Sequence, residues 1–196
     1  FNVGPVSADV KMYDSTDLPE DKFTVVSVAN MTILKGIHYL LDAWEQLDLP
    51  NGRLVLCGTM NDTVRPILKP RIKAMDNVDH VGYVDDPQPY YHQASVLVHP
   101  SLSESFGKVI AEAMASAVPV IVTEHCPTEY VDDAGLVAPI RDADTIADHI
   151  QYLYDNPDEA REMGQRGREI VEANTWDDFS ERIKDAHVTI LEREGY

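Results

Sequence analysis

Short apolar runs that alternate with stretches of helical spacing constrain the fold of this chain more than any other feature of its sequence. The runs lie at residues 23–29 (FTVVSVA), 53–58 (RLVLCG), 78–82 (VDHVG), 95–100 (SVLVHP), 118–123 (VPVIVT) and 135–139 (GLVAP). Such continuous runs are typical of parallel strands buried on both faces. Between them, residues 36–47 and 108–117 carry apolar side chains at helical spacing. The alternation predicts an α/β fold, a Rossmann-like doubly wound parallel sheet.

After residue 140 the pattern is helical, in the stretches TIADHIQYLYD, DEAREMGQRGREIVE and WDDFSERIKDAHVTILE. The chain contains no internal repeat, low-complexity segment or linker. Its 196 residues and 44% hydrophobic content suit one well-packed domain. We therefore expect residues 1–196 to form a single domain in which helices follow the sheet.

The charge of the chain excludes some classes of partner. Acidic residues outnumber basic residues 34 to 16, which gives a formal charge of −18. This charge disfavours nucleic acid or an anionic membrane surface as a partner of the whole domain. Any anion that the domain binds must therefore be held by a local arrangement of donors.

The cysteines and the length of the apolar runs indicate the cellular compartment of the protein. Cys57 and Cys126 lie in or beside apolar segments without paired spacing, which fits a reducing compartment and predicts a cytoplasmic protein. No apolar run reaches the ~18 residues of a membrane helix. The chain opens with Phe1 rather than methionine, so we expect it to be a piece of a longer protein.

The loop HPSLSESFG, at residues 99–107, leads from a buried strand into a helix that we expect to start near Phe106. Ligands of doubly wound sheets collect at the carboxyl ends of the strands, where loops lead into helix N-termini. Free N–H groups and the positive end of the helix dipole make such a place suitable for phosphate. The amides expected to face the cleft belong to Ser105, Phe106, Gly107 and Lys108.

Two glutamates, Glu104 and Glu112, stand eight residues apart around the start of this helix. A helical rise of 1.5 Å per residue puts about 12 Å between them, which is the span of a sugar, a diphosphate and a ribose. The carboxylates could then accept hydrogen bonds from hydroxyls on either side of the diphosphate. The spacing alone also fits a solvated helix residue at Glu112 and a dipole-favoured acid at Glu104. The surrounding pattern PSLxESFGxxxxEAMAxxxPV favours the functional interpretation.

The loop after the first strand, within VSVANMTILKGIHYLLDAW (residues 26–44), lacks the G-x-G-x-x-G fingerprint of a dinucleotide-binding turn. A nicotinamide or flavin fold is therefore disfavoured. Lys35 and Gly36 stand at a helix start instead, where a lysine can neutralise phosphate. A Lys-Gly pair is also ordinary helix-start chemistry, and this alternative stays open.

Taken together, LKGIHYLLDAW, HVGYV, HPSLSESFGKVIAEAMASAVPVIVT and TEYVDDAGLVAP resemble the carboxyl-terminal, donor-binding half of glycosyltransferase family 4, which has the two-domain GT-B architecture. The resemblance runs from about residue 23 to the C-terminus, and its most specific part is the E-x7-E segment. The late stretch DNPDEAREMGQRGREIVEANTWDDF is similar to the helical tail of that family.

The resemblance implies retaining transfer of a sugar from a nucleotide-diphospho-sugar donor to an acceptor, without a cofactor or an essential metal. Glu104 would be the catalytic residue that contacts the donor sugar, Glu112 would contact the ribose, and Lys35 would meet the diphosphate. The segment Gly82 to Val84 would flank the base. The donor-binding residues implied are Asn30, Lys35, Gly36, Tyr83, Val84, Ser105, Phe106, Gly107, Lys108 and Glu112.

The acceptor, a sugar, lipid or small molecule, would bind through an amino-terminal half that this chain lacks. We therefore expect the fragment to be inactive alone, and a peripheral membrane position stays open for the full-length enzyme. Two departures from the family pattern concern the donor side. Asn30 stands where an arginine usually precedes the lysine by five residues, and Cys126 and Pro127 replace a glycine pair before the acid matched by Glu129.

Several features of the sequence resemble functional motifs, but we expect them to have structural roles. The sequence DAD at residues 142–144 matches a metal motif, but Asp142 or Asp144 is expected to cap a helix. The histidines show no zinc-site spacing, so no metal is predicted. RPILKPRIK (residues 65–73) is expected to be a solvated surface segment, with an anionic acceptor or membrane as the alternative. The aromatic residues expected to serve packing are Trp44, Tyr90, Tyr91 and Trp176.

Two rival functions remain open at this stage. A nucleotide-sugar epimerase shares the two-domain architecture and would turn over the donor without an acceptor. A regulatory or interaction module could have kept the sheet and lost catalysis, and it would bind no nucleotide-sugar.

Overall fold

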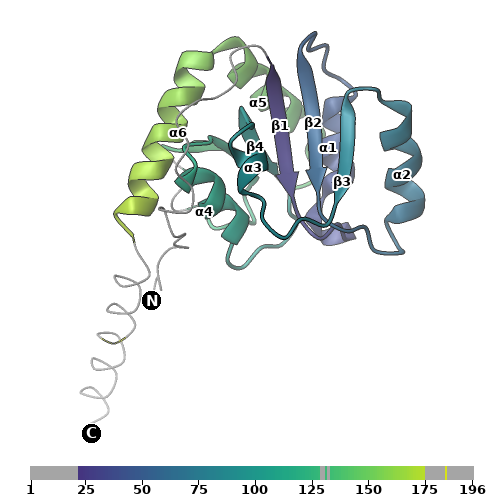
Figure 1. Ribbon diagram of the computed structural model, residues 1–196, viewed down its shortest axis with the longest axis horizontal. Helices are drawn as coiled ribbons and strands as arrows, with labels where there is room; N and C mark the ends of the chain where they lie inside the picture. The colour runs from purple at the N-terminus through teal and green to yellow at the C-terminus, as the bar shows by residue number, and fades with distance from the viewer. Residues whose placement is uncertain (1–21, 129–130, 132, 175–183, 185–196) are drawn as a thin grey trace, which may run out of the picture.

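The computed structural model describes residues 22–128, 131, 133–174 and 184. In this part of the chain, parallel strands form one six-stranded sheet in the order β3-β2-β1-β4-β5-β6 (Figure 1). The strands are β1 (Phe23–Val28), β2 (Gly52–Cys57), β3 (Val78–Gly82), β4 (Val96–His99), β5 (Val120–Thr123) and β6 (Gly135–Ala138). Each predicted apolar run overlaps one strand, which confirms the Rossmann-like doubly wound sheet.

The helices connect the strands as the alternating pattern predicts. They are the 3₁₀ helix η2 (Ile33–Lys35) and the helices α1 (Ile37–Trp44), α2 (Arg65–Ala74), α3 (Gln88–Tyr91), α4 (Lys108–Ala115), α5 (Ala143–Asp155) and α6 (Pro157–Glu172). The two helices predicted between strands are found as α1 and α4, each shorter than expected. The C-terminal helices α5 and α6 follow β6, whereas the predicted third stretch at residues 176–192 lies almost entirely outside the described residues.

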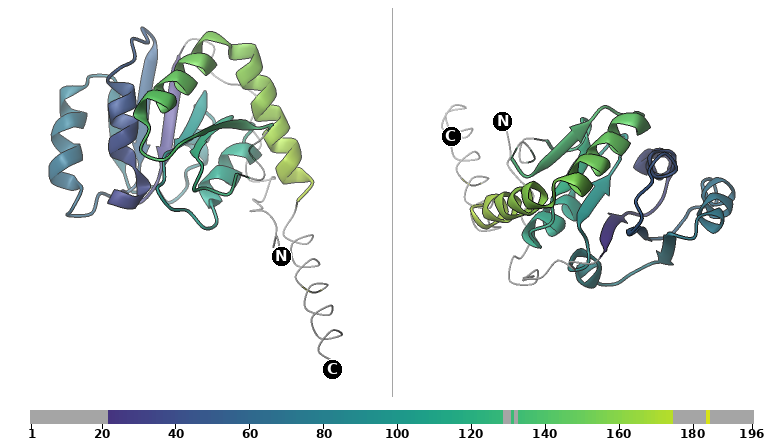
Figure 2. Two further views of the ribbon diagram at one scale, coloured as in Figure 1. Left: turned by 180° about the vertical axis from the view of Figure 1, so that it is seen from behind. Right: turned by 90° about the horizontal axis from the view of Figure 1, so that it is seen from above.

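Each face of the sheet has its own hydrophobic core. Alternate residues of a strand point to opposite faces, so Val25 packs into the core with α1 and α5, and Val26 packs into the core with α3 and α4. Figure 2 shows α1 and α5 on the face seen from behind, opposite α3 and α4 of Figure 1. Burial on both faces explains why the central strands read as continuous apolar runs.

The basic stretch at residues 65–73, expected to be a solvated surface segment, lies within α2. Leu68 and Ile72 are buried against the sheet, while Lys69 and Lys73 are exposed, so the helix is amphipathic. No helix among the described residues is both long and apolar enough to cross a membrane.

The strand order reverses between β1 and β4, and this reversal brings two distant loops together. The loop after β1 contains Leu34, whose carbonyl accepts hydrogen bonds from the amide of Leu102 (2.7 Å) and the hydroxyl of Ser101 (3.2 Å) in the loop after β4. Gly36 has φ +64°, and a Cβ there would lie 1.9 Å from the carbonyl oxygen of Pro100. Only glycine therefore permits this close approach.

Candidate functional site

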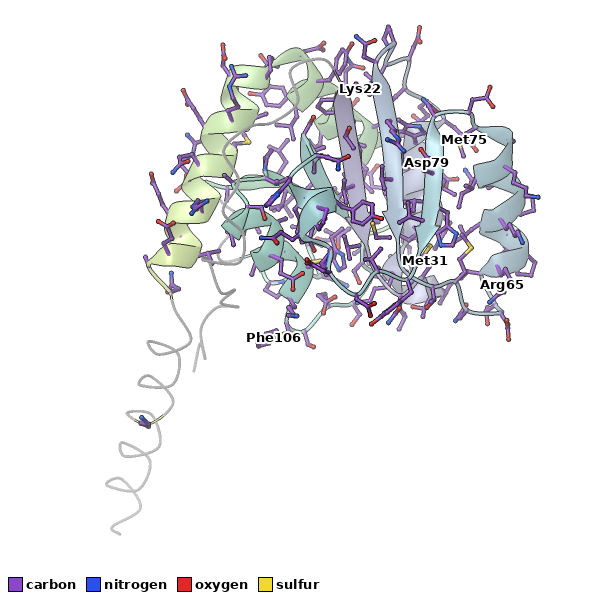
Figure 3. The ribbon with its side chains drawn as sticks, viewed as in Figure 1. Lys22, Met31, Arg65, Met75, Asp79 and Phe106 are labelled. Carbon is purple, nitrogen blue, oxygen red and sulfur yellow. The ribbon has the colours of Figure 1, made fainter. Side chains whose placement is uncertain are left out.

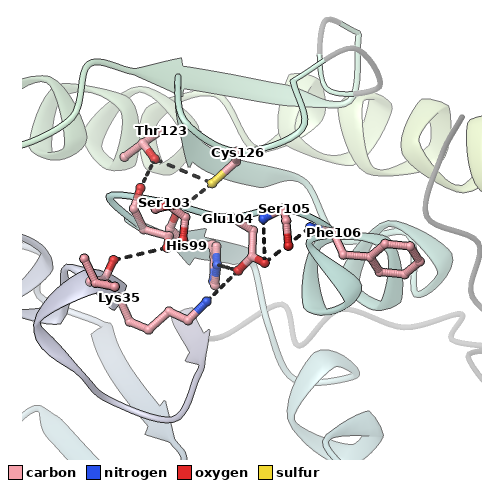
Figure 4. Close-up of polar contacts among 10 residues, drawn as sticks. Lys35, His99, Ser103, Glu104, Ser105, Phe106, Thr123 and Cys126 are labelled. Carbon is pink, nitrogen blue, oxygen red and sulfur yellow. Dashed lines mark hydrogen bonds and ion pairs between the residues drawn. The ribbon is translucent and has the colours of Figure 1, made fainter. Parts of the chain in front are cut away.

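Glu104 lies where the loops after β1 and β4 meet, and four donors surround its carboxylate (Figure 4). Oε2 accepts from Lys35 Nζ at 2.6 Å and from His99 Nε2 at 3.1 Å. Oε1 accepts from the amides of Ser105 at 3.1 Å and Phe106 at 3.4 Å. A carboxylate offers about four lone-pair positions, so the hydrogen-bonding capacity of Glu104 is fully used.

The partners of Glu104 keep it ionised. The hydrogen bond from His99 and the charged hydrogen bond from Lys35 hold the pKa of the Glu104 carboxyl well below its usual range, although burial opposes this shift. An ionised carboxylate only accepts, so Nε2 of His99 carries the hydrogen. At neutral pH, Glu104 is therefore a hydrogen-bond acceptor and not a proton donor.

The helix after this loop starts later than the sequence suggested. We expected a start near Phe106, but α4 begins at Lys108 and Gly107 caps it with φ +67°. The amides of Ser105 and Phe106 donate hydrogen bonds to the carboxylate of Glu104, so these two amides are not available to a ligand. The amides of Gly107 and Lys108 make no hydrogen bond within the described residues and remain available to an anion.

The late helix start also removes the assumption on which the predicted separation of about 12 Å between the two glutamates was based. That figure assumed a helical rise over all eight residue steps, whereas only the four steps from Lys108 to Glu112 are helical. The left-handed conformation of Gly107 interrupts the regular rise.

Glu112 is buried, with only 3% of the residue exposed. Its Oε2 accepts from the hydroxyl of Tyr91 at 2.9 Å, and its Oε1 pairs with Lys108 Nζ at 3.0 Å. The interpretation of Glu112 as a solvated helix residue is therefore wrong. Tyr91 does pack in the core, as expected, but its hydroxyl also serves this carboxylate.

The loop after β5 contacts the loop that carries Glu104. The amide of Glu104 donates to the carbonyl of His125 at 3.1 Å. Cys126 is buried, and its Sγ lies 3.8 Å from the carbonyl oxygen of His99 and 3.5 Å from Thr123 Oγ1 (Figure 4). Burial raises the pKa of this thiol. The Cys126-Pro127 departure thus lies directly against the loop that carries Glu104.

Of the three predicted donor-binding residues after β1, Lys35 alone forms a hydrogen bond with Glu104 among the described residues. Lys35 ends η2 with 27% of its side chain exposed and faces Glu104. Asn30 is exposed at the end of β1, where its Oδ1 accepts from Thr59 Oγ1 at 3.1 Å. The amide of Gly36 donates to the carbonyl of Ile33 at 3.3 Å, so Gly36 shapes the loop rather than offering a free amide.

The residues predicted to flank the base lie at the end of β3 and just after it. In the sheet, β2 separates β3 from β1, the strand that leads to Lys35. Tyr83 is 67% exposed, and Val84 packs against the buried cluster on the α4 face. No hydrogen bond among the described residues links either of them to Glu104. Glu129, which matches a family acid, and Trp176 lie outside the described residues.

The DAD sequence caps a helix, as expected. Asp142 accepts from the amide of Thr145 at 3.0 Å at the start of α5, and the hydrogen bonds from Thr145 lower the pKa of its carboxyl. Within the described ranges, no group of three histidine, cysteine, aspartate or glutamate residues could hold a metal ion.

Sequence reasoning missed two residues of the site, His99 and Tyr91. His99 interrupts the apolar strand VLVH, and a polar residue at the carboxyl end of a buried strand could have indicated it. No comparable signal was present for Tyr91, since its link to Glu112 spans 21 residues and two helices.

The Glu104 cluster lies at the carboxyl ends of β1 and β4. Figure 3 places Met31 and Phe106 at this end of the sheet, and the ring of Phe106 points away from the body of the domain. Ile33, Leu34 and Phe106 are exposed there by 46%, 53% and 40%. Exposed apolar side chains therefore lie on the same two loops as Lys35 and Glu104.

Comparisons with known proteins agree with this geometry. Residues 11–170 match the family described as glycosyl transferases group 1. The O-antigen chain mannosyltransferase B of Escherichia coli is 34% identical over 170 residues, which cover 82% of this chain and 44% of that protein. This chain therefore spans less than half the length of this curated relative.

Solved structures match over almost the whole chain. Sucrose-phosphate synthase from Thermosynechococcus elongatus superposes with a TM-score of 0.83 at 28% identity, covering 96% of this chain and 52% of that structure. Anabaena HepE in complex with UDP and glucose superposes with a TM-score of 0.80 at 20% identity, covering 94% and 55%. The fold is thus one half of the GT-B architecture, as expected.

Proposed function

Because this chain belongs to the group 1 glycosyl transferases, we propose that it is the donor-binding half of a retaining enzyme that transfers a sugar from a nucleoside diphosphate to an acceptor. One observation carries the proposal. Lys35 and Glu104, 69 residues apart, meet at the reversal of strand order, which is where doubly wound sheets bind ligands.

In this proposal, the diphosphate lies between Lys35 and the start of α4. Lys35 supplies a positive charge, and the amides of Gly107 and Lys108 supply donors at the positive end of the helix dipole. Negative charge grows on the diphosphate as its bond to the sugar breaks. Donors that are already oriented toward that charge lower the barrier.

Donor binding would exchange partners within the cluster. Glu104 has no lone pair left while Lys35 is bound to it, so a sugar hydroxyl can bind only if a donor leaves. The diphosphate offers Lys35 a new partner, and the sugar hydroxyl then replaces Lys35 on Oε2. Diphosphate and sugar would thus bind cooperatively at Glu104, the catalytic residue of this proposal.

The other half of the donor would lie toward Glu112 and β3. Glu112 would accept hydrogen bonds from the ribose, while Tyr83 and Val84 would flank the base. The structure of HepE in complex with UDP and glucose makes uridine nucleotides the first candidates. We propose that transfer needs no metal or cofactor, that the acceptor binds through a second domain, that this chain alone does not transfer sugar, and that the enzyme works in the cytoplasm.

A thermal-shift panel tests donor binding. UDP, GDP and ADP, each with and without a glucose or mannose unit, are added at millimolar concentration in the presence of EDTA. A ligand at 100 times its dissociation constant stabilises the folded state by about 2.7 kcal/mol, so the true donor should raise the unfolding temperature. The absence of any shift across the panel would refute the proposal.

Replacement of Lys35 by alanine tests the diphosphate contact. Asn30 provides no second cation, so the loss of a charged hydrogen bond worth about 1.5–3 kcal/mol should weaken the binding of UDP tenfold or more. Calorimetric titration measures the change, with the exposed α2 residue Lys69 replaced by alanine as a matched control. An unchanged dissociation constant for Lys35→Ala would mean that the helix amides suffice.

A further inference from the structure

The hydroxyl of Tyr91 donates a hydrogen bond of 2.9 Å to Oε2 of Glu112 in the protein interior. Tyr91 ends α3, and none of it is exposed to solvent, whereas Glu112 projects from the second turn of α4. A core tyrosine is thus attached to the carboxylate that we assign to the ribose.

Tyr91 is the more rigid of the two partners that hold Glu112. Lys108, which pairs with Oε1, keeps 74% of its side chain exposed and has a long, flexible stem. The ring of Tyr91 is packed in the buried cluster with Ala111 and Met114. A side chain packed in this way keeps a single rotamer, so its hydroxyl fixes the position of Oε2.

The two partners of Glu112 leave it capacity to accept hydrogen bonds from a ligand. Each carboxylate oxygen has two lone pairs; Oε1 forms an ion pair with the Lys108 ammonium at 3.0 Å, and Oε2 accepts the hydrogen bond from Tyr91. One lone pair therefore remains on each oxygen. Two such acceptors on one rigid group match two neighbouring hydroxyls.

We propose that Tyr91 is a positioning residue that holds Glu112 in the orientation needed to accept hydrogen bonds from the 2′- and 3′-hydroxyls of the donor ribose. The inference rests on the proposed function, because it takes Glu112 as the ribose contact. Tyr91 acts through Glu112 and does not touch the nucleotide. Val84, which we assign to the base, packs against the same buried cluster as Tyr91. The proposed contacts to the base and to the ribose are therefore both held by this cluster.

The test compares a nucleotide with a form that lacks the ribose hydroxyls. The probes are UDP, GDP and ADP, and the one that binds the 196-residue chain most tightly is then compared with its 2′,3′-dideoxy form by calorimetric titration. The variants are Tyr91→Phe, which keeps the ring, and Tyr90→Phe as a control, because Tyr90 is half-buried on the same helix and its hydroxyl has no hydrogen bond within the described residues.

We expect the wild-type chain to bind the dideoxy form about tenfold more weakly than the natural nucleotide. Tyr91→Phe should weaken the natural nucleotide about fivefold and leave the dideoxy form almost unchanged, so the discrimination between them shrinks to about twofold. A purely structural role predicts equal weakening of both nucleotides, which would overturn the inference. Tyr90→Phe should leave the discrimination intact.

A double-mutant cycle provides a second test. It compares the effect of Tyr91→Phe on nucleotide affinity in two backgrounds, so it stays informative even if the substitution also lowers the stability of the fold. In a Glu112→Gln background, Tyr91→Phe should change nucleotide affinity by less than about twofold, because its effect passes through the carboxylate. Equal effects of Tyr91→Phe in both backgrounds would contradict the inference. If none of the three nucleotides binds the wild-type chain, the proposed function itself fails, which is a different result from binding with unchanged discrimination.

Discussion

The two glutamates of the site show how differently one residue type can be prepared for a ligand. Glu104 has four donors on its carboxylate, two of them from side chains on separate loops or strands, and 15% of its side chain is exposed. Glu112 has two donors, and 4% of its side chain is exposed. Glu104 is saturated and must exchange a partner, whereas Glu112 is held firmly with acceptor capacity to spare.

This difference separates two modes of recognition. Under the proposed function, Glu112 would accept the ribose without first losing an interaction, whereas at Glu104 part of the gain would be offset by the broken ion pair with Lys35. The exchange at Glu104 would then make sugar binding depend on the diphosphate, which a free sugar lacks.

The largest effect is expected at Glu112. Glu112→Gln keeps the size of the side chain but removes its charge, and it should weaken UDP and UDP-glucose alike, by tenfold or more, since both carry the ribose. Calorimetric titration of both ligands measures the losses. A loss confined to the nucleotide-sugar would break the assignment of Glu112 to the ribose.

A smaller effect of opposite sign is expected at Glu104. Glu104→Gln releases Lys35 from its ion pair, so UDP alone should bind about fivefold more tightly, which corresponds to about 1 kcal/mol. The additional affinity contributed by the sugar of UDP-glucose should disappear. Equal weakening of UDP and UDP-glucose would show that the two glutamates do not divide the donor between them.

The ionised state of Glu104 predicts a dependence of stability on pH. Its pKa is lowered in the folded state, so its contribution to stability is present above its ordinary pKa of 4.5 and is lost as the pH falls through the folded-state value. The unfolding temperature of the wild-type chain should therefore fall more steeply below pH 4.5 than that of Glu104→Gln. Glu169→Gln, at an exposed position on α6, is the matched control, and identical slopes for all three proteins would contradict the prediction.

The smallest effect is expected for the side chain of Lys108. The Lys108 side chain is 74% exposed, so solvent and salt screen its attraction to Glu112, and Lys108→Ala should weaken UDP binding by no more than about threefold while its backbone amide remains in place. A loss as large as that of Glu112→Gln would mean that Lys108, rather than Tyr91, holds the carboxylate.

Much of the fold and part of the site could be predicted from the sequence. The strand pattern, the loop that precedes α4 and the pairing of Asp142 with a helix start depend on neighbours in the chain. The helix start at Lys108 was misplaced because Glu104 competes for the amides of Ser105 and Phe106. That competition depends on the orientation of one side chain, which local propensity does not specify.

Hydrophobic periodicity and capping act over a few residues, so the buried parallel strands, the order of elements and the presence of acids beside a helix start follow from local sequence. Which groups meet depends instead on contacts between elements that are far apart in the chain. The reversal between β1 and β4 joins Lys35 to Glu104, and the packing of α3 on α4 joins Tyr91 to Glu112. These contacts span 69 and 21 residues, and they form because the sheet and its two cores fix the elements in space.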